Sequence, residues 1–355
     1  MKVVFVMELT NNNLAAFFTA ENLEDFFMHM ADALISPAVG GVMWAVSAGA
    51  LAYSANKLNK ENIIETKKMP LMGIAGAFVF AAQMINFTIP MTGSSGHLGG
   101  GLLLAALLGS NAGFLVISVV LTIQALFFAD GGLVALGCNI FNMGFLACYV
   151  AYPYIFKPII ASGINKKSLT IASIAGAVVS LLTGSFGVVL QTLMSGITEL
   201  PFKAFAGLML PIHLAIGAVE GIITAAVLIF INSEQPELLS RRPASGSMKR
   251  IIIVMLTVTV FCSGILSWFA SSNPDGLEWS VFNTAKTEEV GAVFEPAERL
   301  QESTSFMPDY GFKDAEESNI GTTAAGLIGS TMVLLISCFI GFLSLRFRKR
   351  CNTNE

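Results

Sequence analysis

The stretch AFAGLMLPIHLAIGAVEGIITAAVLIFIN, residues 204–232, sets the class of the fold. A helix needs about 20 mainly apolar residues to cross the hydrocarbon core of a bilayer, and this stretch exceeds that length with a single carboxylate, Glu220. The whole chain has the same character, because 54% of its 355 residues are apolar and 12% are charged. A typical soluble domain carries about 25% charged residues. We therefore expect an all-α, polytopic membrane protein in which lipid is the solvent for most of the chain.

Eight further stretches have the composition of membrane helices, although the one at 98–110 is short and rich in glycine. We expect that short helix to start late or to pack closely on its neighbours. Few charges interrupt these stretches, since each charged side chain costs roughly 2.5–3.5 kcal/mol at the centre of a membrane helix. In chain order, the nine expected crossings are 34–56, 69–91, 98–110, 113–129, 132–161, 168–195, 204–232, 250–270 and 321–345.

Lysine and arginine residues alternate between the loops in the way that the positive-inside rule describes. If the segment before the first helix lies outside, 15 basic residues fall inside and five fall outside. The inner ones are Lys57, Lys60, Lys67, Lys68, Lys157, Lys166, Lys167, Arg241, Arg242, Lys249, Arg250, Arg346, Arg348, Lys349 and Arg350; the outer ones are Lys2, Lys203, Lys286, Arg299 and Lys313. This asymmetry predicts nine crossings with an outer start and a cytoplasmic C-terminus.

The stretch SEQPELLSRRPASGS within residues 233–249 has the composition of a cytoplasmic linker. Before it, residues 28–232 are expected to form a seven-helix unit. After it, residues 250–355 are expected to form two helices joined by an external loop rich in Glu and Asp. Residues 1–27 form an N-terminal extension that reads poorly as a signal peptide, because it lacks a clean small-residue cleavage site.

Small residues are frequent inside the expected helices, for example at Gly73, Gly76, Gly217 and Gly221. In lipid, close approach of backbones is a main source of helix association. We therefore expect these glycines to pack helices tightly against one another.

Several classes of function find no support in the sequence. The chain has no G-x-x-x-x-G-K-[ST] motif for ATP and no HExxH motif of a membrane protease, and no basic patch points to nucleic acid. Four of the five cysteines lie in apolar runs and one in the basic tail, so we expect small hydrophobic fillers rather than disulfides. We do not expect an enzyme, and active transport would take its energy from a partner or an ion gradient.

Two of the three histidines fall on the outer side of the expected topology. His29 precedes the first helix, in MHMAD (28–32), and His97 follows the second, in SSGHLGGG (94–101). One helical hairpin separates them, so the chain returns to the same face. Imidazole suits nickel, cobalt, copper and zinc, and the glycines beside His97 allow the backbone to approach a ligand closely. The residues alone leave two interpretations open, a metal site or two histidines that meet by chance at an interface.

Other polar residues fall within the apolar helices or at their ends. His213 and Glu220 lie seven residues apart and share a helix face, which fits either a hydrogen-bonded structural pair or a transport relay. Asn139 and Asn142 are spaced i, i+3, and polar contacts between helices are the default interpretation for them. Asp130 lies at an outer helix end, where we expect a turn.

Five motifs occur in order over residues 28–232 and together resemble the CbiM/NikM family. They are MHMAD (28–32), the loop of Gly96 and His97, QALFFADGG (124–132), LGCNIFNM (136–143) and the segment from His213 to Glu220. Members of that family are substrate-specific components of energy-coupling factor (ECF) transporters for cobalt and nickel. PDGLEW, at 274–279, is similar to the PDGLE signature of the accessory CbiN/NikN-type component, so the chain resembles a fusion of the two.

The resemblance implies a seven-helix substrate-binding bundle with a two-helix accessory unit in the inner membrane of a prokaryotic cell. It implies Ni²⁺ or Co²⁺ as the transported substrate, without a cofactor, for cobalamin synthesis or for nickel enzymes. The implied partners are a transmembrane coupling subunit and cytosolic ATPases of an ABC importer. The alternative is a self-sufficient secondary transporter or channel that uses His213 and Glu220 as an intramembrane relay.

The resemblance also implies a set of nitrogen ligands for the metal. These are the amino-terminal nitrogen of Met28, the backbone nitrogen and imidazole of His29, and the imidazole of His97. A nearly planar set of four nitrogens suits Ni(II), and metal binding should weaken as the pH falls because its ligands must be deprotonated. Because a free amine is needed at Met28, we expect translation to begin there; the alternatives are removal of residues 1–27 or a site without the amine.

Three further residues are expected to support this site. Asp32, three residues after His29, could orient its imidazole by a hydrogen bond. Ser95 and Gly96 precede His97 directly and are expected to shape its loop.

Overall fold

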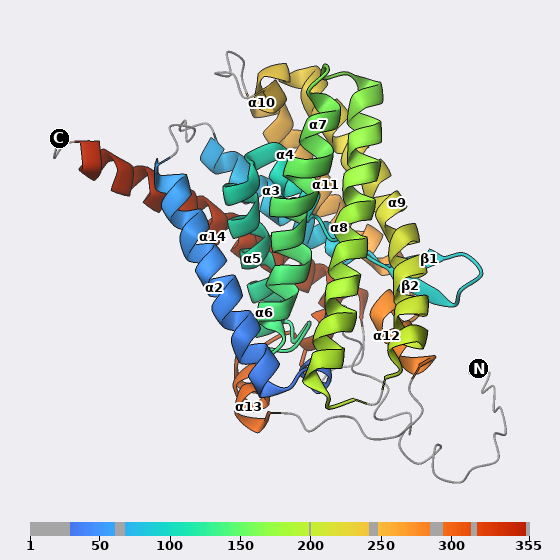
Figure 1. Cartoon of the computed structure of the whole chain (residues 1–355). Helices are drawn as coiled ribbons and strands as arrows, with labels where there is room; N and C mark the ends of the chain where they lie inside the picture. Colours follow the sequence, from blue (N-terminus) through green and yellow to red (C-terminus); the bar gives the residue numbers. More distant parts are fainter. Residues whose placement is uncertain are drawn as a thin grey trace, which may run out of the picture.

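The computed structural model describes residues 29–60, 68–198, 200–240, 248–284, 294–313 and 318–352 (Figure 1). The predicted extension and the centre of the predicted linker lie outside these ranges. The helices are η1 (Asp32–Leu34), α2 (Pro37–Lys60), α3 (Lys68–Gln83), α4 (Gly101–Leu108), α5 (Ser110–Phe127), α6 (Leu136–Asn139), the π-helix η2 (Ile140–Phe156), α7 (Lys157–Ile160), α8 (Lys166–Ser195), α9 (Phe202–Glu234), α10 (Pro236–Ser240), α11 (Lys249–Gly264), η3 (Leu266–Phe269), α12 (Gly276–Phe282), α13 (Glu295–Thr304), η4 (Pro308–Tyr310) and α14 (Asn319–Asn352). Two short strands, β1 (Phe87–Ile89) and β2 (Ser94–Gly96), pair in antiparallel fashion.

The prediction of an all-α polytopic membrane protein is confirmed. Within the described residues, six helices are long and apolar enough to cross a bilayer. They are α2, α5, the continuous rod of α6, η2 and α7, and then α8, α9 and α14. Three of the nine expected crossings coincide with shorter helices, since α3 and α11 have 16 residues each and α4 has 8. The count of nine crossings therefore stays a prediction.

Helix α4 is short and lies wholly inside the protein. All eight of its residues are buried, and at 1.5 Å per residue it rises about 12 Å, less than half the hydrocarbon thickness of roughly 30 Å. The chain turns at Gly109, whose φ of 92° lies outside the usual range for other residues, and continues as α5. The expected late start and close packing of this helix are confirmed.

Glycines bring helix backbones into contact, as the sequence predicts. A Cβ on Gly217 of α9 would lie 2.8 Å from the Cα of Val178 on α8. A Cβ on Gly76 of α3 would lie 2.8 Å from the Val333 side chain on α14. The two C-terminal helices therefore pack on the N-terminal bundle, with α14 and α11 both against α3 (Figure 1).

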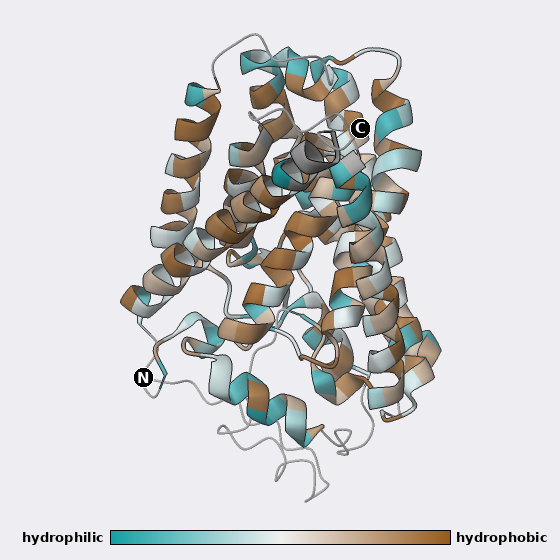
Figure 2. Ribbon diagram, turned by 90° about the vertical axis from the view of Figure 1, so that its left-hand side faces the viewer, coloured by the Kyte–Doolittle hydropathy of each residue, from teal (hydrophilic) through white to brown (hydrophobic). Residues whose placement is uncertain are grey.

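Different short helices lie at the two ends of the bundle. The segment that leads into α2, together with α12 and α13, lies toward one end, and α7 and α10 lie at the other (Figure 1). Apolar residues dominate the helix bodies and hydrophilic ones gather toward the ends (Figure 2). Among the described side chains, Cys138, Cys148, Cys262 and Cys338 are free, which agrees with the prediction of hydrophobic fillers. The orientation in the membrane stays a prediction.

Replacing Gly221 by alanine tests the packing of α9 on α8. Its Cβ would collide with the Cα of Ile174 and lie 3.0 Å from the backbone nitrogen of that residue, and backbone atoms cannot move away as a flexible side chain can. We expect the free energy of unfolding to fall by roughly 1–3 kcal/mol, seen as a lower Tm of the detergent-solubilised protein. Gly207→Ala is the matched control on the same helix, because its added Cβ meets no described atom within 4 Å apart from its chain neighbours and the nearby backbone of α9 itself. Equal Tm values for the two variants would contradict this packing.

Candidate metal site

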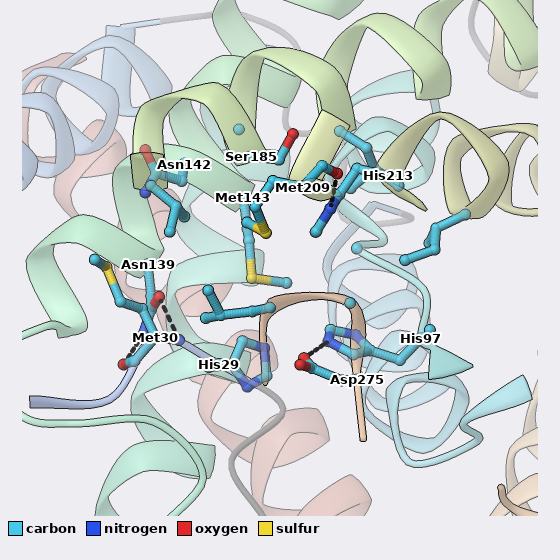
Figure 3. Close-up of a pocket in the computed structure, with 18 residues that line it drawn as sticks. His29, Met30, His97, Asn139, Asn142, Met143, Ser185, Met209, His213 and Asp275 are labelled. Carbon is cyan, nitrogen blue, oxygen red and sulfur yellow. Dashed lines mark hydrogen bonds and ion pairs between the residues drawn. The ribbon is translucent and has the colours of Figure 1, made fainter. Parts of the chain in front are cut away.

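The structure brings His29 and His97 together in the wall of one cavity. Their ring centroids lie 5.2 Å apart with the planes inclined by 52°, and both rings line a cavity of about 70 Å³ (Figure 3). His29 is 4% exposed. Met28, the third predicted metal-binding residue, lies outside the described residues.

Asn139 anchors the segment that carries His29. Its amide oxygen accepts a hydrogen bond from the backbone nitrogen of Met30, and its amide nitrogen donates to the carbonyl of the same residue, each at 3.2 Å (Figure 3). The carbonyl of Met30 also accepts from the backbone nitrogen of Gly132 at 3.1 Å. Asn139 therefore binds an extended segment of chain, and the prediction that it joins two helices is wrong.

Asp130 orients the imidazole of His29. The Nδ1–H of His29 donates to Oδ1 of Asp130 at 2.8 Å, and the Tyr310 hydroxyl donates to Oδ2 at 2.5 Å. Ala129 and Gly131 on either side adopt positive φ values of 54° and 84°, so the expected turn is present and serves to aim this carboxylate. Burial by itself raises the pKa of Asp130, but the charge and hydrogen bond of His29, followed by the bond of Tyr310, outweigh burial and hold that pKa below its ordinary value.

Asp32 does not have the role expected from its position near His29. Its Oδ1 accepts a hydrogen bond from the backbone nitrogen of Ala135 at 2.9 Å, so it ties the segment to the start of α6. Burial raises the pKa of Asp32, while its backbone hydrogen bonds act in the opposite direction. The carboxylate that holds the imidazole belongs to Asp130, and the prediction for Asp32 is wrong.

The second nitrogen of His29 is the atom that a metal could use. Nε2 is buried and has no hydrogen-bond partner in the described part of the chain, which costs about 1–3 kcal/mol unless a ligand binds there. A carboxylate on one imidazole nitrogen with a metal on the other is a common arrangement that orients the ring. The described residues contain no group of three or more His, Cys, Asp or Glu side chains that could hold a metal ion.

His97 is held by the loop around it. Its Nδ1–H donates to the carbonyl of Leu98 at 3.1 Å, which leaves Nε2 to face the carboxylate of Asp275 at 4.0 Å. Ser95 and Gly96 shape this loop, as expected. The Ser95 hydroxyl donates to the carbonyl of Asn273 at 2.8 Å, and a Cβ on Gly96 would collide with the side chain of Ile216.

His213 and Glu220 bond to other groups rather than to each other, so the structural pair considered from their spacing is not formed. Nδ1 of His213 donates to the carbonyl of Met209 at 2.8 Å while its ring lines the cavity (Figure 3). Glu220 accepts hydrogen bonds from the backbone nitrogens of Gly99 and Gly100 at 2.8 and 3.1 Å. Glu220 thereby fixes the stretch that follows His97.

Asn142 joins two helices, as predicted. Its amide exchanges two hydrogen bonds with Gln191 of α8, at 2.7 and 3.1 Å. The same side chain lines the cavity on the side opposite Asp275 (Figure 3).

Sequence reasoning missed the two residues of the C-terminal unit that reach this site, Asp275 and Tyr310. Tyr310 bonds to Asp130, as described above, and accepts from the Gln124 amide at 3.1 Å. Asp275 is 6% exposed; burial raises its pKa to about 7, against the lowering effect of the backbone nitrogens of Glu278 and Leu277. The PDGLE motif was a signal for Asp275, but nothing in the sequence placed that motif beside His97.

Comparison with known families divides the chain in two. Residues 29–238 match the family described as the cobalt uptake substrate-specific transmembrane region. Residues 249–346 match the PDGLE domain. The first match alone covers more than half of the chain.

Individual relatives extend over nearly the whole chain. A putative fused nickel transport protein, NikMN, from Archaeoglobus fulgidus is 30% identical over 334 residues, which cover 91% of this chain and 99% of that protein. The fused nickel transport protein NikMN from Rhodobacter capsulatus is 28% identical, covering 86% of this chain and 95% of the relative. A crystal structure of a transition metal transporter, 30% identical, aligns with a TM-score of 0.50 over 58% of this chain and 92% of that one.

Replacing Asp130 by asparagine tests whether this carboxylate prepares His29 for a metal. The amide keeps the shape and one acceptor but removes the charge, so we expect the affinity for Ni²⁺ or Co²⁺ to fall by roughly 10–100-fold, measured by calorimetry on purified protein. Glu295→Gln is the control, since Glu295 pairs with Arg299 on the exposed surface of α13. Unchanged or tighter binding by Asp130→Asn would contradict this role and would point to Nδ1, released from Asp130, as the metal ligand.

Proposed function

The chain belongs to the family of cobalt uptake substrate-specific transmembrane regions, and on this basis we propose that it is the substrate-binding membrane subunit of an ECF-type importer for Ni²⁺ or Co²⁺. The observation that carries the proposal is that His29 and His97 lie next to each other and line one small cavity. Imidazole nitrogen is a preferred ligand of both metals. The names of the two fused relatives, both nickel transport proteins, support the same substrate class.

The size of the cavity supports an ion as substrate. Pockets for drug-sized molecules occupy about 300–1,000 Å³, whereas this one has about 70 Å³. Its walls combine imidazole and amide groups with apolar side chains, as in Figure 3. A single metal ion with few waters matches that space and chemistry better than an organic substrate does.

The proposed ligands are the amino nitrogen of Met28, the backbone nitrogen and imidazole of His29, and the imidazole of His97. A chelate ring through the backbone nitrogen of His29 uses Nδ1 of that residue, the nitrogen nearer to the backbone. In the described geometry Nδ1 bonds to Asp130 and Nε2 is the free donor. The planar chelate therefore requires Nδ1 of His29 to leave Asp130 and bind the metal, and in that case Asp130→Asn would not weaken binding. Binding through Nε2 keeps the hydrogen bond to Asp130 and gives the weaker binding expected above for Asp130→Asn.

The proposed partners are a transmembrane coupling subunit and cytosolic ATPases, because the sequence has no nucleotide-binding P-loop. The protein is proposed to lie in the inner membrane of a prokaryotic cell, with the metal site outside and the C-terminus in the cytoplasm. The imported metal would serve cobalamin synthesis or nickel enzymes. The alternative relay through His213 and Glu220 loses its support, since their described hydrogen bonds go to backbone groups.

Replacing either histidine of the site tests the function directly. We expect His29→Ala and His97→Ala each to abolish uptake of radioactive Ni²⁺ or Co²⁺ by cells that carry the partner subunits, because each removes a ligand. The amount of folded protein in the membrane should stay the same. Wild-type uptake by both variants would reject the proposal, and uptake by the wild type without any partner subunit would favour a secondary transporter.

The amino nitrogen of Met28 is available only if no residue precedes it. We therefore expect the intact mass of purified, transport-active protein to correspond to a chain that begins at Met28. A mass that includes residues 1–27, in protein that still imports metal, would exclude the amine from the ligand set.

A further inference from the structure

The C-terminal unit contributes a carboxylate to the wall of the metal cavity. Asp275 directly precedes α12, and its Oδ2 lies 4.0 Å from Nε2 of His97 (Figure 3). The residue is 6% exposed and lines the same cavity as His29. A buried carboxylate of the C-terminal unit therefore faces Nε2 of His97 in the wall of the same cavity.

Hydrogen bonds hold the segment just before Asp275 against the loop that carries His97. The backbone nitrogen of Ser95 donates to the carbonyl of Pro274, and the Ser95 hydroxyl donates to the carbonyl of Asn273, both at 2.8 Å. On the other side, Gly276 fits closely against α9, since a Cβ there would lie 2.7 Å from Ile212. The motif is thus held between the hairpin and α9, which determines where Asp275 points.

The local structure accounts for only one of the two carboxylate oxygens. Oδ1 of Asp275 accepts a hydrogen bond from the backbone nitrogen of Glu278 at 2.8 Å, and Oε2 of Glu278 accepts from the backbone nitrogen of Asp275 at 3.2 Å. This is a capping box at the start of α12. Asn and Ser cap helices about as well as Asp, so capping does not require a negative charge. Oδ2, which faces His97, has no part in the cap.

Asp275 also lines a second cavity, of about 380 Å³. The walls of this second cavity come from both units of the chain, including Asn86 and Tyr310, and Glu278 and Asp309 add carboxylates. Asp275 therefore lines both cavities, the larger one and the one that His29 and His97 line. A divalent cation attracted into the larger cavity would meet it next to His97.

We propose that Asp275 is part of the metal-binding site, where its carboxylate balances the charge of the cation held at His97. This inference rests on the proposed function and deepens it, because it makes the two units of the chain share one site. Nitrogen ligands that are neutral leave the charge of a buried divalent cation uncompensated, and burying an unpaired charge is strongly unfavourable. A fixed carboxylate within a few ångströms offsets that cost and favours divalent over monovalent ions.

Asp275→Asn in the full-length protein removes the negative charge and keeps a residue that can cap α12. We expect calorimetric titration with NiCl₂ or CoCl₂ to show at least tenfold weaker binding, since a loss of about 1.4 kcal/mol corresponds to tenfold. The Tm without metal should match that of the wild type. Glu278→Gln is the matched control, because it neutralises the other carboxylate of the same capping box and lines only the larger of the two cavities; its affinity should stay within about twofold of the wild type.

Asp275→Ser, a second uncharged capping residue, should weaken binding to the same extent, and Asp275→Glu should recover part of the affinity. Wild-type affinity in both Asp275→Asn and Asp275→Ser would overturn the inference. It would also be overturned if both variants bound metal more weakly and both had a lower Tm without metal, because the weaker binding would then come from misfolding. Failure of the wild type to bind either metal would instead reject the proposed function.

Discussion

The hydrogen bond from Nδ1 of His29 to Asp130 joins the parts of the chain on which the site depends. His29 comes from the segment before the first long helix, and Asp130 comes from the turn after α5. Tyr310, from the C-terminal unit, bonds to the same carboxylate. All three side chains are buried, so their polar atoms need hydrogen-bond partners within the protein. Because these side chains bond to one another, moving one of them would break the hydrogen bonds of the others. Within the described part of the chain, this network leaves Nε2 of His29 without a hydrogen-bond partner, and His29 lines the cavity.

Glycines in the turns and loops around this network allow the chain to approach neighbouring residues closely. Gly131 is required by the close approach of His29, whose Cβ would lie 2.8 Å from a Cβ at that position. Gly132 likewise leaves space for Asp32. The glycine-rich stretch after His97 lets two consecutive backbone nitrogens reach Glu220, with Gly100 at a φ of 75°. Backbone shape thus acts together with the hydrogen bonds of Asp130 and Asn139 to place the two histidines next to each other.

The sequence predicted what depends on local composition and periodicity. The long helices, the buried short helix at Gly101 and the return of both histidines to one side follow from hydropathy and loop charge. Asp130 was expected to make a turn, and the positive φ of Ala129 shows that it does, but its tertiary partner cannot be read from local sequence. Asp32 was expected at the imidazole because it is near in sequence, yet η1 directs it to Ala135. Proximity along the chain was the wrong guide at a site assembled from several separate segments.

The most direct measurement is anomalous X-ray scattering at the nickel absorption edge from crystals of the full-length protein grown with Ni²⁺. We predict one strong peak in the cavity, within coordinating distance of the rings of His29 and His97, with the carboxylate of Asp275 facing it. A strong peak elsewhere in the protein, with no density between the two histidines, would contradict a metal site built by both units of the chain.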